Sequence, residues 1–198
     1  HGQEPKLAYA KGFTGNAWGI AITTDEQGNT YTVGRFSGNC DFDPGPGTAI
    51  LQNASSVSND LFVAKLDPNG EFIWVKHINS DGYCPSSVAS SVQVADDGSI
   101  FVAGYIDCPF DFDEGSGLFT LQPGSFIAKY SAAGTIDWVK GIGGGQYQAG
   151  PDMVLINDAV VVVGSFTGSF DFDPGPGVHT MTGSRDAFIL KLDLNGVF

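Results

Sequence analysis

The chain of 198 residues is poor in basic side chains and lacks long hydrophobic segments. It has 9 Lys and Arg against 22 Asp and Glu, which gives a net charge of −13 at pH 7. This charge opposes binding to nucleic acid and to anionic membrane surfaces, so we expect neither partner. No run of 18 apolar residues is present, so we expect no membrane insertion. No segment keeps a 3.6-residue apolar period, which predicts essentially no helix.

The sequence also lacks the motifs of the common enzyme classes. His1, His77 and His179 are scattered, and no repeated segment places a nucleophile beside a base. Gly-x-Ser-x-Gly, His-Glu-x-x-His and phosphate-binding loop motifs are missing. We therefore expect a protein that is not an enzyme.

A seven-residue motif is repeated along the chain. Asp-Phe-Asp-Pro-Gly-Pro-Gly occupies residues 41–47 and again 171–177, and the related Asp-Phe-Asp-Glu-Gly-Ser-Gly occupies 111–117. An internal repeat of this period is typical of solenoids, propellers and arrays.

Each repeat is predicted to form four short strands, named a to d in chain order. Strand b is an apolar run that ends at Gly34, Gly104 or Gly164; strand c begins at Phe62, Phe126 or Phe188; strand d carries Trp-Val-Lys at 74–76 and 138–140. Asn-Gly and Asp-Gly turns separate these runs, as in β-hairpins. We predict an all-β fold of three tandem, four-stranded, propeller-like blades built as antiparallel meanders. The single domain, 1–198, is expected to contain a partial blade at 1–12 and repeats at about 13–78, 79–142 and 143–198, called units 1, 2 and 3.

The first and last segments lie at the same phase of the repeat. Val197-Phe198 begins a strand d, and residues 6–11 resemble a strand d in which Tyr9 takes the place of Trp. Exposed strand edges favour aggregation, so we expect the two partial blades to meet. One possibility is closure within the chain. Three blades are too few for the usual ring, so we expect the contact between chains, head to tail, or along a longer chain. The assembly strand would then involve Tyr9, Lys11, Phe188 and Phe198.

Two of the three cysteines lie in irregular connections. Cys84 is in an expanded connection from strand d to strand a, and Cys108 is in an atypical connection from strand b to strand c. These connections share one rim of a meander, which predicts a Cys84–Cys108 disulfide and an oxidising compartment. Cys40 takes the place of Phe110 and Phe170, so we expect it to be buried and free.

The repeated aspartates are candidate calcium ligands. Residues i and i+2 of an extended segment share a face, so the two carboxylates of each motif point the same way, next to a turn with free carbonyls. The candidate ligands are Asp41, Asp43, Asp111, Asp113, Glu114, Asp171 and Asp173. The alternative is that these carboxylates accept hydrogen bonds from the N–H groups of their own turn. No other cofactor is expected.

Two segments resemble a known repeat family. Residues 28–38, Gly-Asn-Thr-Tyr-Thr-Val-Gly-Arg-Phe-Ser-Gly, and residues 62–74, Phe-Val-Ala-Lys-Leu-Asp-Pro-Asn-Gly-Glu-Phe-Ile-Trp, resemble the SBBP type of β-propeller repeat of secreted bacterial proteins. The Asp-Phe-Asp-Pro-Gly insertion resembles the version in large surface proteins of gliding-type bacteria. The resemblance covers all three units and implies four-stranded blades, an extracellular or cell-surface location and no enzymatic activity.

These observations together favour a structural or adhesive function. We expect a surface protein that assembles with copies of itself or with adjacent repeats into a filament or surface layer. The alternative is a calcium-dependent propeller that binds a ligand such as a surface glycan.

Overall fold

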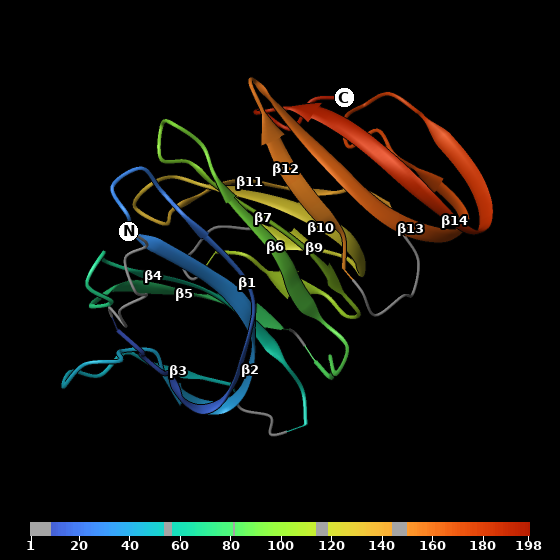
Figure 1. Cartoon of the computed structure of the whole chain (residues 1–198). Coiled ribbons are helices and arrows are strands. Elements are labelled where there is room, and N and C mark those ends of the chain that lie inside the picture. The colour runs from blue at the N-terminus through green and yellow to red at the C-terminus, as the bar shows by residue number, and fades with distance from the viewer. Residues whose placement is uncertain (1–8, 54–56, 81, 114–118, 144–149) are drawn as a thin grey trace, which may run out of the picture.

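The structure, a computed structural model, describes residues 9–53, 57–80, 82–113, 119–143 and 150–198. These residues form antiparallel strands joined by turns, and none of them forms a helix (Figure 1). A helix that could cross a membrane is accordingly absent from this part of the chain. The prediction of an all-β chain with essentially no helix is confirmed for the described residues.

The main strands fall into three groups that follow the three repeats. Unit 1 contains β1 (Thr14–Thr24), β2 (Thr30–Asp41), β4 (Asp60–Leu66) and β5 (Phe72–Ser80), with the short β3 (Ile50–Gln52) paired to β2. Unit 2 contains β6 (Val88–Val94), β7 (Ile100–Ile106), β10 (Gly124–Tyr130) and β11 (Ile136–Gly141). Unit 3 contains β12 (Asp152–Ile156), β13 (Ala159–Asp171) and β14 (Thr180–Asp193). Units 1 and 2 therefore have strands a to d, whereas the described residues of unit 3 provide strands a to c.

Two short strands of unit 2 extend the sheet of unit 1. β8 (Phe110–Asp111) pairs with the end of β5, and β9 (Thr120–Leu121) pairs with β8. The sheet order is therefore β1-β2-β4-β5-β8-β9. The sequence did not predict this exchange between units. It satisfies backbone N–H and C=O groups where β5 extends beyond its pairing with β4.

A phenylalanine on strand c covers the glycine of strand b in every unit. The glycine removes the side chain that would otherwise occupy the space of the ring, and the ring shields the glycine backbone. A Cβ added to Gly104 would lie 2.6 Å from the Phe126 ring and 2.3 Å from the Val88 carbonyl oxygen. The opposed pairs are Gly34–Phe62, Gly104–Phe126 and Gly164–Phe188.

Apolar side chains fill the space between neighbouring sheets. The buried cluster between units 1 and 2 includes Val33, Val63, Val92, Val102 and Phe126. The buried cluster between units 2 and 3 includes Ala103, Ile127, Val160, Leu190 and Leu192. Burial of one such branched side chain contributes roughly 1.5–3 kcal/mol, so each unit depends on its neighbour for much of its stability.

The three units spread like a fan. Strands a lie against one another, β1 against β6 and β6 against β12. The outer strands β5 and β11 are separated by the β8–β9 hairpin, because β8 pairs with β5 and β9 contacts β11. Figure 1 shows the units following one another from β1 to β14, and the described residues form no closed ring.

The packing of the strand b glycine leads to a stability prediction. Gly104→Ala is expected to lower the free energy of unfolding by about 1–3 kcal/mol, because the added methyl group meets the Val88 carbonyl and the Phe126 ring. The matched control is Gly141→Ala on β11, where the nearest side-chain atom, from Leu121, is 3.5 Å from the new Cβ. Urea unfolding measures both changes, and equal stabilities of the two variants would contradict the prediction.

Candidate functional site

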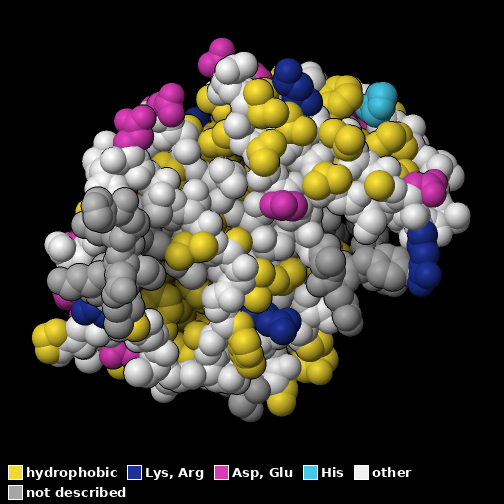
Figure 2. Space-filling view, viewed as in Figure 1, with side chains coloured by type: hydrophobic (Ala, Val, Ile, Leu, Met, Phe, Trp, Pro, Cys, Tyr) yellow, Lys and Arg dark blue, Asp and Glu magenta, His cyan; other side chains and the backbone are white. Residues whose placement is uncertain are grey.

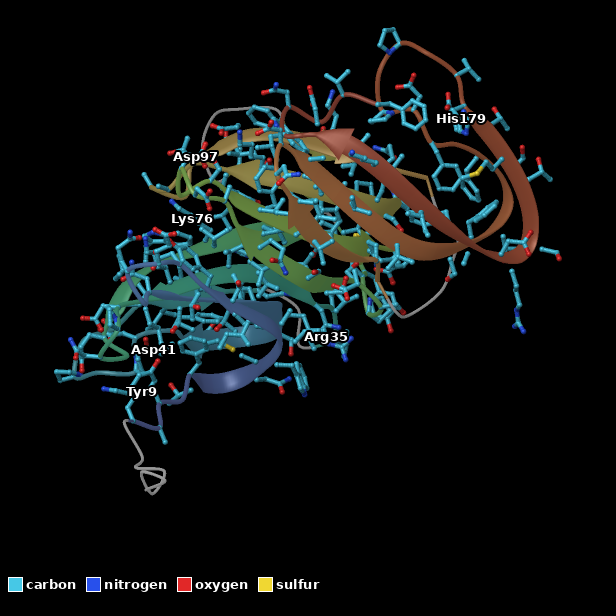
Figure 3. The ribbon with its side chains drawn as sticks, turned by 45° about the horizontal axis from the view of Figure 1, so that its top comes forward. Tyr9, Arg35, Asp41, Lys76, Asp97 and His179 are labelled. Atoms are coloured by element: carbon cyan, nitrogen blue, oxygen red, sulfur yellow. A yellow bond between two sulfur atoms is a disulfide. The ribbon has the colours of Figure 1, made fainter. Side chains whose placement is uncertain are left out.

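Residues 9–13 lie on the surface of unit 1. The Tyr9 hydroxyl is 3.4 Å from Thr30 Oγ1, and Lys11 Nζ donates a 3.0 Å hydrogen bond to Glu71 Oε1. The Tyr9 ring covers Gly70, whose φ of 77° places the turn between strands c and d in the left-handed region. These contacts fix Tyr9 at the unit 1 end of the molecule (Figure 3).

The same contact recurs at each boundary between units. Lys76 and Trp74 of unit 1 cover Gly134 in the turn of unit 2, and Trp138 and Lys140 of unit 2 cover Gly196 in the turn of unit 3. Tyr9 and Lys11 therefore occupy on unit 1 the place that strand d of one unit occupies on the next.

Two further contacts support this equivalence. Phe13 packs against Phe42 and Phe62, with ring centroids 5.0 Å and 6.1 Å away. Its equivalent Ile78 lies in the same buried cluster as Phe112 and Phe126, which are the equivalents of Phe42 and Phe62 in unit 2. Thr14 pairs with Asp41 as Asn79 pairs with Asp111. Residues 9–13 themselves form no strand, because the described chain offers them no strand c to pair with.

The second edge of β14 is the place where a strand d would bind. β4 lies between β2 and β5, and β10 lies between β7 and β11. β14 pairs with β13 and, among the described residues, with no other strand. Lys65 lies opposite Trp74 and Lys129 opposite Trp138. An open groove of about 530 Å³, lined in part by Lys191 and Phe198, lies beside the equivalent position on β14.

The structure does not bring the predicted assembly residues together within one chain. Phe188 is buried opposite Gly164, and the Phe198 ring lies 5.0 Å from the His179 ring. Tyr9 and His179 lie at opposite ends of the molecule (Figure 3). Closure within the chain would require residues 6–11 to pair with β14. Residues 9–11 instead lie on unit 1, and residues 6–8 lie outside the described ranges.

The first aspartates of the repeated motif accept hydrogen bonds from their own loop. Asp41 Oδ1 accepts from the N–H groups of Ala49 at 2.8 Å and Asp43 at 3.0 Å. Asp43 Oδ1 accepts from the Gly45 N–H at 2.7 Å. The bond from Ala49 and then that from Asp43 lower the pKa of Asp41.

The third copy repeats this geometry, and the second copy keeps its first bond. Asp171 Oδ1 accepts from His179 N–H at 2.7 Å and from Asp173 N–H at 3.0 Å, and these bonds lower the pKa of Asp171. Asp111 Oδ1 accepts from Asp113 N–H at 2.9 Å. The predicted ligand Glu114 lies outside the described residues.

The glycines of the motif provide room for the second aspartate. A Cβ on Gly47 would lie 2.2 Å from Asp43 Oδ2, and a Cβ on Gly177 would lie 2.0 Å from Asp173 Oδ2. This packing explains the glycine at the last position of the motif in units 1 and 3. Among the described residues, no group of three or more His, Cys, Asp or Glu side chains is arranged to hold a metal ion. Hydrogen bonds within the loop engage five of the predicted ligands, Asp41, Asp43, Asp111, Asp171 and Asp173, and calcium binding stays a prediction.

Cys84 and Cys108 form a disulfide, as the sequence predicted, with Cα atoms 5.5 Å apart. The bond joins the connection after β5 to the connection after β7. Cys40 is free and buried beside Phe36 and Phe42. Burial raises the pKa of the Cys40 thiol, which suits a packing role rather than a reactive one.

One polar cluster was not predicted from the sequence. His77 Nε2 lies 2.6 Å from Asp60 Oδ2, and Asp60 Oδ1 accepts a 3.0 Å hydrogen bond from Ser80 N–H. Two grooves of about 300 and 480 Å³ beside this pair share His77 and Asp113. A signal existed in the repeat, because His77 stands where strand d of unit 2 has Gly141.

The loop hydrogen bonds predict a pH effect at Asp171. A carboxyl with a lowered folded-state pKa stabilises the fold above its unfolded pKa of about 3.9, and this stabilisation is lost as the pH falls through the lower folded value. Asp171→Ala should therefore lower the melting temperature at neutral pH and reduce its fall between about pH 4 and pH 2. The exposed Asp137 on β11 provides the control, Asp137→Ala. An unchanged pH profile in Asp171→Ala would count against the loop role.

The calcium hypothesis predicts a chelator effect. A cation bound only by the folded chain stabilises it by mass action, so EDTA should lower the melting temperature and added calcium should restore it. Asp173→Asn should remove part of this response. A melting temperature that is indifferent to both reagents would support the hydrogen-bonded turn instead.

Comparison with known proteins gives one distant similarity. No family model matches the chain. An uncharacterised WD repeat-containing protein of Acanthamoeba polyphaga mimivirus is 29% identical over 157 residues, which cover 73% of this chain. The match spans 11% of the length of that relative. WD repeats build β-propellers, so the similarity supports a propeller-type repeat, and the SBBP type stays a prediction.

Proposed function

We propose that the protein is a non-enzymatic, extracellular, structural or adhesive module of the β-propeller type that assembles by strand completion. The incoming strand is a strand d, which pairs with the second edge of β14. A neighbouring chain or a further repeat of the same polypeptide can supply it. The observation that carries this proposal is the edge of β14, because its counterparts β4 and β10 each pair on both sides.

The chemistry of the edge specifies the incoming strand. Main-chain hydrogen bonds provide affinity in strand addition, and pockets for alternate side chains provide specificity. The groove beside Lys191 corresponds to the position of Trp74 beside Lys65. An aromatic-x-Lys strand therefore fits β14, as Trp-Val-Lys fits β4 and β10.

Two observations support an extracellular structural role. The Cys84–Cys108 disulfide suits an oxidising compartment. The three units repeat the same contacts, whereas an active site is normally unique in a chain. Their carboxylates at 41 and 171 are engaged by backbone donors rather than directed at a shared cleft.

Strand completion is tested with a peptide of residues 6–13, Lys-Leu-Ala-Tyr-Ala-Lys-Gly-Phe. At low protein concentration, where copies of the chain do not occupy the edge of β14, the fluorescent peptide should bind the protein and slow amide hydrogen exchange in β14. The control peptide carries Ala10→Pro, which removes a backbone N–H and disfavours strand pairing. Equal binding of the two peptides, or unchanged exchange in β14, would contradict the proposal.

A further inference from the structure

The face of unit 3 that is turned away from unit 2 is apolar and exposed. Figure 2 shows hydrophobic side chains spread over the region of β12 to β14. Val163 and Ile189 lie opposite each other on this face, and Ile189 is 77% exposed. The equivalent of Ile189 is Val63 in unit 1 and Ile127 in unit 2, which are 1% and 0% exposed. In those units the face is covered by the next unit.

The opposite end of the molecule has the matching face. Ile22 on β1 pairs with Thr32 and is 68% exposed. Its equivalent in unit 2 is Val92, which pairs with Val102, is 1% exposed and packs against unit 1. We call the face of a unit that is turned toward the preceding unit its front face, and the face that is turned toward the following unit its outer face. The front face of unit 1, which carries Ile22, is therefore the counterpart of the surface that unit 2 presents to unit 1.

These two exposed faces are equivalent to the two surfaces that meet between units 1 and 2 and again between units 2 and 3. The outer face of unit 1 binds the front face of unit 2, and the outer face of unit 2 binds the front face of unit 3. The outer face of unit 3 and the front face of unit 1 remain, at opposite ends of the molecule (Figure 1). A second copy of this chain presents the required front face with residues 9–13 already in the place of a strand d.

The arrangement of the three units favours a ring over a straight filament. Strands a lie together while β5 and β11 are held apart by β8–β9, so successive units turn about an axis near the strands a. Propellers close with about four to eight blades. Six is the multiple of three within that range, and two copies of a three-unit chain supply six.

We propose that two copies associate head to tail into a closed ring of six units, in which each copy completes the last unit of the other. The inference rests on the proposed function, because it names the supplier of the strand that pairs with β14. It differs from the open filament expected from the sequence. A heterologous contact closes into a ring when the rotation between neighbours permits it.

The repeat defines the register of the contact between copies. Trp74 lies opposite Lys65 and Lys76 opposite Val63. By equivalence, Tyr9 of one copy lies opposite Lys191 of the other, and Lys11 lies opposite Ile189. The ring buries both apolar faces. Each chain carries a net charge of −13, so added salt should strengthen the dimer by screening repulsion between copies.

The mass in solution tests the ring. Analytical ultracentrifugation of the 198-residue chain should give a single species at twice the chain mass of 20.8 kDa, and higher concentrations should add no larger species. Ile189→Asp and Ile22→Asp should each raise the dimer dissociation constant at least about tenfold, because each places a charge in an apolar contact. The matched control is Val178→Asp, which alters a 79% exposed residue in the Pro-Gly loop of unit 3 and should leave the mass unchanged.

Mixing the two interface variants tests the head-to-tail geometry. Ile189→Asp keeps an intact front face and Ile22→Asp keeps an intact outer face, so their mixture should form dimers through one native contact. Tyr9→Cys combined with Lys191→Cys should give a covalent dimer on oxidation. Tyr9→Cys combined with Lys129→Cys, on the equivalent strand of unit 2, should not.

Each remaining result has a defined meaning. A ladder of larger species would overturn the ring in favour of a filament. A protein that stays monomeric at every concentration while the 6–13 peptide binds β14 would overturn the pairing of copies and leave strand completion intact. Failure of the peptide to bind, together with dimers that persist in Ile189→Asp and Ile22→Asp, would overturn both proposals.

Discussion

Hydrogen bonding at strand edges is the constraint on which the rest of this structure depends. A backbone N–H or C=O group without a partner is costly once it is removed from water, and a long exposed edge invites another strand. β4 and β10 are paired on both sides, and the extension of β5 is paired with β8 from the next unit. β14 keeps one open edge among the described residues. That edge is where the proposed strand completion would take place.

Contacts between units are as regular as the strands themselves. Each unit has a glycine in the turn between strands c and d, with a φ of 77°, 78° or 73°. An aromatic residue and a lysine cover this glycine. They come from strand d of the preceding unit or, in unit 1, from residues 9–11. The absence of a Cβ at Gly70, Gly134 and Gly196 permits this close approach. Each sheet is thus stabilised by its neighbours, as in other repeat proteins. The outer face of unit 3 is not covered by another unit among the described residues, and the proposed partner would bind there.

The acidic loops illustrate how a charged motif can act locally. Asp41 and Asp171 each accept two backbone hydrogen bonds, and Asp43 and Asp173 pack over the glycines of the same loop. These bonds stabilise the carboxylate form and explain the lowered pKa of the first aspartate in each loop. The motif is repeated because the turn is repeated. In units 1 and 3 the turn needs the two aspartates as hydrogen-bond acceptors and the glycines as space for the second aspartate.

The sequence by itself determined the elements whose causes lie within a few residues. The recurring apolar runs located strands b and c, although strand b continues past Gly34 to Asp41 and does not end at the glycine as predicted. The aspartate turns use donors two to eight residues away, so their spacing pointed to the hydrogen-bonded turn as one of two alternatives. The Cys84–Cys108 pairing followed from two irregular loops on one rim. Only the tertiary structure decided that β8 joins β5, that His77 meets Asp60, and that residues 9–13 pack on unit 1. Those contacts join segments that are separated in the sequence, and their geometry depends on how strands pair and how units pack, which a local pattern does not encode.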